Sequence, residues 1–119
     1  MSNPDNAELD TKWRQRLEAE HEDLLASSRT SSQDRAPVSL DQQSVGRLAR
    51  MDAMQIQAMA QASERRRQAR ITSLRQALSR LASGEYGYCE RCGNDIPAGR
   101  LEVDATARLC VPCAEGKDP

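Results

Sequence analysis

The chain of 119 residues is long enough for one ordinary domain or two very small ones. Aromatic residues make up 3% and hydrophobic residues 38% of it, below the usual ~45–50%, and there is no phenylalanine. Sandwiches, barrels and α/β sheets need bulky aromatic and β-branched side chains to fill their layers, so this composition argues against those classes. It favours an elongated, mainly α protein with one small, separately stabilised module.

The formal net charge of −1 is an average over three blocks of opposite sign. Residues 39–84 carry eight bases against three acids, whereas residues 1–38 and 85–119 each have three more acids than bases. The middle block could therefore meet phosphate, which the flanks would repel. Apolar runs are far shorter than the ~20 residues that span a bilayer, and the polar N-terminus lacks the features of a signal peptide. We expect a cytoplasmic protein that does not bind membranes.

A first helix is expected from about Glu8 to Ser28. Asp5 and Glu8 have the spacing of a capping box. Apolar residues then recur on one side of the helix, at Leu9, Trp13, Leu17 and Leu24. Residues 27–38 are rich in Ser and Thr and contain Pro37, so they predict a loop.

A second helix is expected from about Ser39 to Ser83. Ser39 and Gln42 fit a capping box, and Gly84 supplies a C-terminal stop. A helix of roughly 44 residues is typical of coiled-coil packing. The two helices together predict an antiparallel hairpin over residues 1–84, with its tip near residues 28–40.

The apolar pattern of this second helix changes along its length. Its first part carries a Met-rich stripe of Val45, Leu48, Met51, Ile56 and Met59. Its last part has heptad-like spacing at Ile71, Leu74, Leu78 and Leu81. Because the first helix is about half as long as the second, it can cover only part of this surface. The rest must pack on the metal module, on a second copy, or on nothing.

Four cysteines form two Cys-x-x-Cys pairs, Cys89 with Cys92 and Cys110 with Cys113, separated by 17 residues. This spacing predicts a four-cysteine zinc site, since each tight turn aims two sulfurs at one point and two such turns complete a tetrahedron. Disulfides, a redox pair or an iron–sulfur cluster are the alternatives. We expect one structural Zn²⁺ within a module of residues 85–119 that ends in a short tail. The residues between the pairs are long enough for a short hairpin or ribbon.

No grouping of residues points to an enzyme. Four sulfurs would leave zinc no open position for water, and no Ser-His-Asp set, phosphate-binding glycine loop or pair of converging acids is visible. His21, the only histidine, is expected to pack in the first helix. The basic run Arg65, Arg66 and Arg67 forms either a solvated face or a contact with phosphate or an acidic protein surface.

The surroundings of the cysteines resemble one known zinc finger. The lead-in Gly-x-x-Gly-Tyr-Cys-x-x-Cys-Gly, the Ile96-Pro97 step, Arg100-Leu101-Glu102 and the Leu109-Cys110-x-x-Cys113 ending resemble the finger of the DksA/TraR family of bacterial transcription regulators. The long helix before the finger agrees in position and character. The stretch LDQQSVGRLARMDAMQ looks like that of the family's short, finger-bearing paralogues.

The resemblance implies direct binding to RNA polymerase, rather than reading of promoter DNA. It implies that the hairpin enters the secondary channel, with acidic residues and an alanine at its tip. The candidate tip residues are Asp41, Asp52 and Ala53, although the two acids also fit a solvated face. We expect a weak or absent response to the alarmone ppGpp, because Ala114 follows the last cysteine where the family would have a basic residue.

Two other functions remain open. The first is a nucleic-acid-binding zinc module with a basic helix, whose affinity would fall steeply with salt. The second is a structural dimerisation coiled coil with a metal cap, which the incompletely covered second helix favours. We expect a monomer or a weak dimer.

Overall fold

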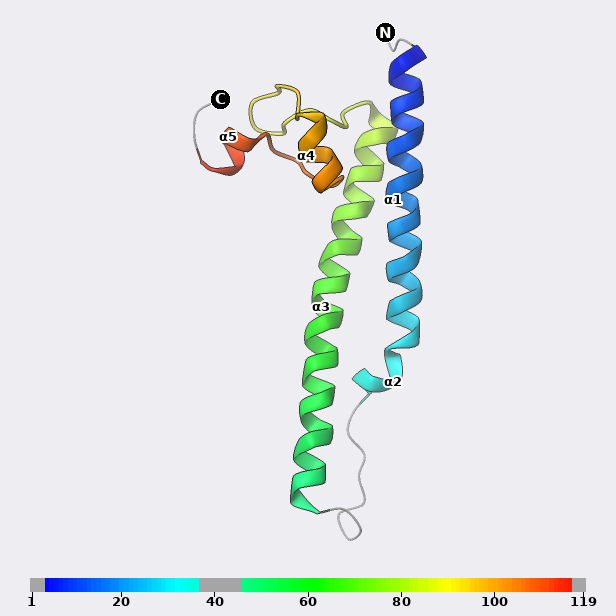
Figure 1. Ribbon diagram of the computed structural model, residues 1–119, viewed down its shortest axis with the longest axis vertical. Helices are drawn as coiled ribbons and strands as arrows, with labels where there is room; N and C mark the ends of the chain where they lie inside the picture. Colours follow the sequence, from blue (N-terminus) through cyan, green and yellow to red (C-terminus); the bar gives the residue numbers. More distant parts are fainter. Residues whose placement is uncertain (1–3, 37–45, 117–119) are drawn as a thin grey trace. The chain divides into compact units, whose positions relative to one another are not determined.

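The computed structural model describes residues 4–36 and 46–116 (Figure 1). Its helices are α1 (Pro4–Thr30), α2 (Ser32–Arg35), α3 (Arg47–Ser83), α4 (Ala98–Val103) and α5 (Val111–Ala114). The described residues contain no strand beyond one isolated antiparallel bridge between Tyr88 and Asp95. The predicted fold class, mainly α with a small four-cysteine module, is therefore confirmed.

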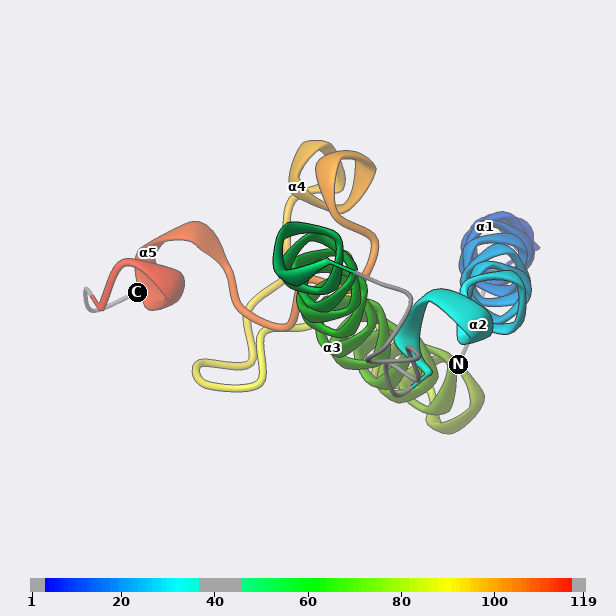
Figure 2. The ribbon, with the colours of Figure 1, turned by 90° about the horizontal axis from the view of Figure 1, so that it is seen from below.

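The chain divides into two compact units. Residues 1–22 and 72–119 form one, here called the finger unit, and residues 23–71 form the other, here called the middle unit. Within the finger unit, α4 and α5 are separate short segments in both views (Figures 1 and 2). None of the helices described is both long and apolar enough to cross a membrane.

Helix α1 is longer than its sequence pattern predicts. It begins at Pro4 rather than near Glu8, and proline is favoured at a first helical position. It also continues to Thr30, and α2 follows at once, so the prediction of a loop from residue 27 is wrong. Hydroxyl groups that would otherwise favour a turn donate to helix carbonyls here: Thr30 Oγ1 to Ser27 O at 3.1 Å and Ser31 Oγ to Ser28 O at 3.3 Å.

Helix α3 begins at Arg47, so the expected uninterrupted helix from Ser39 is wrong. Gly46 lies outside the helix, and its carbonyl accepts the N–H of Arg50 at 3.1 Å. The capping box expected at Ser39 and the last four residues of the expected hairpin tip, 37–40, lie outside the described residues. At its other end α3 stops at Ser83, where Gly84 follows with a φ of 80° that only glycine adopts readily.

The finger unit has a small apolar core drawn from both long helices. Leu17 of α1 and Leu74 and Ala77 of α3 are fully buried, and Trp13 and Leu81 are nearly so. All of these except Ala77 are members of the predicted stripes, and burying each large side chain contributes about 1.5–3 kcal/mol. The Met-rich stripe of the middle unit differs, because its described members are exposed: Leu48, Met51, Ile56 and Met59.

A buried carboxylate joins three helices of the middle unit. Glu64 of α3 is 8% exposed and accepts hydrogen bonds from Ser28 Oγ of α1 at 2.7 Å and from Gln68 Nε2 at 3.0 Å. It also forms ion pairs with Arg35 of α2 at 3.2 Å and with Arg67 at 2.9 Å. The hydrogen bond from Ser28, together with these other donors, lowers the pKa of Glu64 below its usual value of 4.5.

Replacing this carboxylate should destabilise the middle unit. We expect Glu64→Ala to lower the free energy of unfolding by about 3 kcal/mol, because it leaves the partly buried guanidinium of Arg67 without its anion. Arg65→Ala, at an exposed neighbouring position, should change it by less than about 0.5 kcal/mol. Urea unfolding followed by circular dichroism measures both values, and equal effects of the two changes would contradict the role of Glu64.

The wild type and Glu64→Ala should also differ in how their stability responds to acid. A lowered pKa means that the contribution of Glu64 to stability is complete above about 4.5 and is lost as pH falls through the lower, folded-state pKa. The difference in unfolding free energy between the wild type and Glu64→Ala should therefore shrink below this pH. A difference that stays constant down to pH 3 would contradict the assignment.

Candidate metal centre

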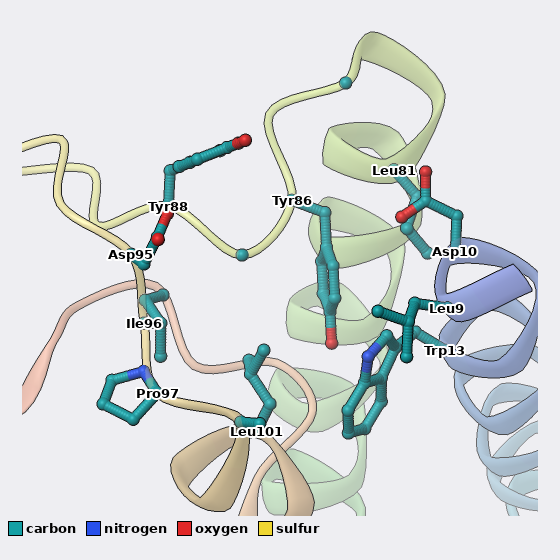
Figure 3. A pocket seen from close by; sticks show the side chains of 13 residues that line it. Leu9, Asp10, Trp13, Leu81, Tyr86, Tyr88, Asp95, Ile96, Pro97 and Leu101 are labelled. Carbon is teal, nitrogen blue, oxygen red and sulfur yellow. The ribbon is translucent and has the colours of Figure 1, made fainter. Parts of the chain in front are cut away.

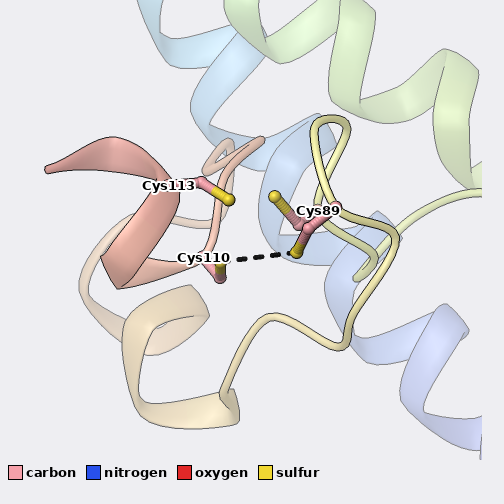
Figure 4. Close-up of side chains that lie close together, drawn as sticks. Cys89, Cys110 and Cys113 are labelled. Atoms are coloured by element: carbon pink, nitrogen blue, oxygen red, sulfur yellow. Dashed lines mark hydrogen bonds between the residues drawn. The ribbon is translucent and has the colours of Figure 1, made fainter. Parts of the chain in front are cut away.

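The four cysteines converge on one point at the end of the finger unit (Figure 4). Cys89 and Cys92 lie in the turns that follow α3, Cys110 directly precedes α5, and Cys113 lies within α5. Their sulfur atoms all lie within 4.8 Å of one another, and none forms a disulfide. Cys89, Cys110 and Cys113 are buried, whereas Cys92 is half-buried.

Backbone hydrogen bonds shape the two cysteine turns. In the first, Cys89 N–H donates to Asn94 O at 2.8 Å and Gly93 N–H donates to Cys89 O at 2.9 Å, with Gly93 at a φ of 78°. In the second, Ala114 N–H donates to Cys110 O at 2.9 Å across the single turn of α5. Each Cys-x-x-Cys segment thus forms a local turn, and this turn directs its two sulfur atoms toward the common site.

The distance between the sulfur atoms fits a zinc ion and not a disulfide. Cys92 Sγ lies 3.7 Å from Cys110 Sγ. A tetrahedron with Zn–S bonds of ~2.3 Å has edges of about 3.8 Å, whereas bonded sulfurs lie ~2.05 Å apart. The donor set of four sulfurs, in this geometry, fits one tetrahedral Zn²⁺.

The protonation of the thiols shows why a cation is needed. Burial opposes ionisation of Cys89, but the N–H groups of Cys92, Cys110 and Arg91 lower the pKa of its thiol to about 6. Burial raises the pKa of Cys113 to about 12, and the neighbouring thiols add to this shift. The cluster alone therefore does not hold four thiolates at neutral pH. A bound divalent cation supplies the charge that deprotonates them.

The insert between the cysteine pairs contains the short helix α4 and not the hairpin or ribbon that its length allowed. The carbonyl of Pro97 accepts the N–H of Leu101 at 3.2 Å, which begins α4. The side chain of Arg100 on α4 donates to Leu109 O at 2.8 Å, just before the second cysteine pair. This contact, rather than the helix propensity of a segment that contains Gly99, holds α4 in place.

Several polar contacts attach the finger to α3. Arg80 is 9% exposed, and its guanidinium donates to Thr106 O at 3.4 Å and lies 3.5 Å from a carboxylate oxygen of Glu90. Tyr86 OH donates to Ala105 O at 2.7 Å. Burial is the main reason why the pKa of Tyr86 is raised to about 12. These contacts join residues 10 to 26 positions apart, which no local sequence pattern indicates.

Further polar contacts attach the finger to α1. Arg16 donates to Glu102 O at 2.6 Å, Lys12 pairs with the Glu102 carboxylate at 3.0 Å, and the Trp13 ring lies 6.2 Å from the Tyr86 ring between centroids. The metal-ordered loop, α1 and α3 therefore share one polar and aromatic junction. Among these residues, the sequence indicates Trp13, as part of the apolar stripe, and Glu102, as part of the Arg100-Leu101-Glu102 motif, but not their contacts.

The other predicted site residues that the structure describes belong to the middle unit, whereas the cysteines belong to the finger unit. Asp52 is exposed and Ala53 half-buried on α3, and Asp41 lies outside the described residues. Arg65 and Arg66 are exposed, whereas Arg67 pairs with Glu64. Their roles in binding a partner stay predictions. His21, in the finger unit, packs between helices, since its Nε2 accepts Arg75 Nε of α3 at 3.2 Å.

Comparisons with known proteins agree on the finger and on the fold. Residues 84–119 match the prokaryotic dksA/traR C4-type zinc finger family. An uncharacterized protein of Aquifex aeolicus is 46% identical over 48 residues, which are 38% of this chain and 33% of that protein. The RNA polymerase-binding transcription factor DksA of Escherichia coli is 40% identical over 43 residues, 36% of this chain and 28% of that protein.

The matched segments thus span no more than about a third of these relatives' length. The fold extends the likeness further. The structure of transcription factor DksA2 from Pseudomonas aeruginosa matches with a TM-score of 0.78 over 96% of this chain and 84% of that chain, at 22% identity. Together with the sulfur cluster, the finger family points to one structural zinc ion, as the cysteine spacing predicted.

Loss of any one cysteine should release the metal. We expect one zinc per wild-type chain by mass spectrometry of metals and less than about a tenth of that for Cys113→Ser, since three ligands bind far less tightly than four. The emission of Trp13 should shift to the red as its contact with Tyr86 is lost. Ser79→Ala, at an exposed position of α3, is the control, and full zinc content in Cys113→Ser would contradict the site.

The hydroxyl of Tyr86 should contribute measurably to stability. Tyr86→Phe leaves Ala105 O without its 2.7 Å donor, so we expect a loss of about 1 kcal/mol in unfolding free energy. A raised pKa of about 12 also means that this contribution is complete below pH 10 and is lost as pH rises toward 12. The control is Tyr88→Phe, at a half-exposed ring, and an equal loss there would contradict the role of Tyr86.

Proposed function

We propose that this chain is a member of the DksA/TraR family and a transcription regulator that binds RNA polymerase directly. The observation that carries the proposal is the match to the dksA/traR finger in a chain whose fold resembles that of DksA2. Curated relatives that share the finger are named as RNA polymerase-binding transcription factors and not as enzymes. A metal held by four sulfurs supports a structural role, since it has no open position for substrate.

We further propose that the middle unit enters the secondary channel of the polymerase. A pair of helices is slender enough for a narrow channel, and the Glu64 junction holds α1, α2 and α3 together without a bulky core. Asp52, exposed on the second turn of α3, is the described carboxylate that we assign to the polymerase contact, with Ala53 beside it. Asp41 is the second candidate for this contact.

Direct binding of promoter DNA is not part of the proposal. The finger region carries more acids than bases, and four thiolates around Zn²⁺ add two further negative charges. In the basic run, Arg67 is engaged by Glu64, which leaves the exposed Arg65 and Arg66 for phosphate or an acidic protein surface. We propose a weak or absent response to ppGpp, because the exposed residue after the last cysteine is Ala114, where the resemblance to the family implies a basic residue. Saturable, cooperative binding of ppGpp to the complex would contradict this.

Retention by core RNA polymerase tests the proposal. Zinc-loaded wild-type chain should be retained, and Cys89→Ser should lose most of this binding because the finger no longer folds. Asp52→Asn should keep the binding but change the lifetime of promoter complexes by severalfold, whereas Asp34→Asn, an exposed acid of α2, should change neither.

The other functions predict different outcomes of the same experiment. Failure of the zinc-loaded wild type to bind polymerase would overturn the proposal. Binding to duplex DNA without polymerase, with a steep salt dependence, would favour the nucleic-acid module. A stable dimer in sedimentation, with neither of these activities, would favour the dimerisation coiled coil.

A further inference from the structure

The finger unit contains an open cavity of about 720 Å³ (Figure 3). It is lined by the first turns of α1, the end of α3, the turns before Cys89 and the start of α4. Trp13, Tyr86 and Tyr88 all line it, and they are the only aromatic residues of the chain. A sequence with 3% aromatics therefore places all of them around one cavity.

The cavity has a buried apolar floor and a half-exposed apolar rim. Trp13, Leu81 and Leu101 of the floor are each at most 6% exposed. Leu9 and Tyr88 at the rim are each 50% exposed, which is unusual for large apolar side chains that face a cavity. This surface can cover the apolar stem of an incoming side chain.

Two carboxylates line the cavity without a cation of their own. Most other acids near the finger have partners, since Glu102 pairs with Lys12 and Arg16, and Glu90 pairs with Arg80 and Arg108. For the side chains of Asp10 and Asp95, by contrast, no hydrogen bond or ion pair is found in the part of the chain that the structure describes. The cavity therefore combines unpaired negative charge with aromatic rings.

The same aromatic group already attracts cations from within the chain. Lys12 Nζ lies 5.1 Å and the Arg16 guanidinium carbon 5.3 Å from the centroid of the Trp13 ring. Both of these cations are also engaged by Glu102. They leave the rim at Tyr88, where Asp95 lies beside the ring (Figure 3), for a cation from outside.

We propose that this cavity binds an arginine side chain presented by a partner protein. The aliphatic stem of arginine would pack on the buried floor, and its planar guanidinium would stack on Tyr88 and pair with Asp95, while Asp10 adds negative charge across the cavity. Arginine fits better than lysine, because its fork of donors can bind both oxygens of one carboxylate while its flat face covers a ring. Nucleic acid does not fit, since its phosphates would meet two carboxylates in an acidic region.

The identity of the partner is a separate step. That the arginine belongs to RNA polymerase rests on the proposed function, whereas the ligand chemistry of the cavity does not. The experiment therefore has one part that needs no polymerase and one part that does.

The first part uses short peptides and the single tryptophan as the probe. We expect acetyl-Leu-Arg-Leu-amide to change the Trp13 fluorescence and its indole ¹H–¹⁵N resonance of the zinc-loaded chain saturably. Acetyl-Leu-citrulline-Leu-amide, which has the same shape without the charge, should bind at least about tenfold more weakly. The double variant Asp10→Asn, Asp95→Asn should weaken the arginine peptide by about tenfold, with zinc content unchanged. Glu18→Gln, an exposed acid on the same helix as Asp10, should leave binding unchanged.

Three outcomes would overturn the proposal. Equal binding of the citrulline peptide would show a purely apolar site. A Trp13 signal that changes with protein concentration alone, and is insensitive to peptide, would show that a second copy covers the cavity. The absence of a saturable change in both the fluorescence and the resonance would show that the cavity does not take this ligand.

The second part measures retention of the Asp10→Asn, Asp95→Asn variant on core RNA polymerase beside the wild type. A loss of about tenfold or more in apparent affinity would assign the arginine to the polymerase. If the peptide binds but wild-type chain is not retained by polymerase, the proposed function fails and the arginine site stands. If wild type is retained and neither peptide binds, the proposed function stands and the arginine site fails.

Discussion

The finger unit depends on four sulfurs held around one zinc ion. The region from residue 85 onward is too short to bury an adequate apolar core, so its folding energy must come mainly from the metal, about 10–16 kcal/mol in comparable peptides. Once the two cysteine turns are fixed, Arg80 and Tyr86 meet the carbonyls of Thr106 and Ala105. The end of α3 is thereby tied to the finger, and the contacts of Lys12 and Arg16 with Glu102 tie α1 to it.

The middle unit is also poor in apolar residues, and a buried carboxylate, where the finger has a metal, connects its helices. Glu64 gathers Ser28, Arg35 and Arg67 from three helices, and hydrogen bonds to the charged carboxylate lower its pKa. Such a junction is directional, so it specifies how these helices meet, but breaking one partner leaves a buried charge behind. Meanwhile the described residues of the Met-rich stripe of α3 remain exposed, so this stripe adds little apolar packing to the unit.

The sequence predicted those features that local spacing decides. Two residues between cysteines suffice to aim a pair of sulfurs, and apolar recurrence suffices to identify Leu17 and Leu74 as core. The prediction from sequence was wrong where contacts between residues distant in the chain determine the structure. Helix α1 runs past Ser27 because Ser28 has a partner 36 positions away, and the helix α4 was missed because its flanking contacts depend on the folded finger. The burial of Glu64 has no sequence signal, since a charged residue among arginines usually lies on a solvated face.

The low aromatic content has a different meaning after the structure is known. In an ordinary globule three rings would disappear into the core, but here Tyr86 and Trp13 form the floor of a cavity whose rim ring, Tyr88, remains half-exposed. Tyr86 is held there by its hydroxyl bond to Ala105 O, so the loop between the cysteine pairs fixes one wall of the cavity. Of the three rings, the one left half outside the fold lies at the rim of the cavity, where a partner rather than the fold would complete its packing.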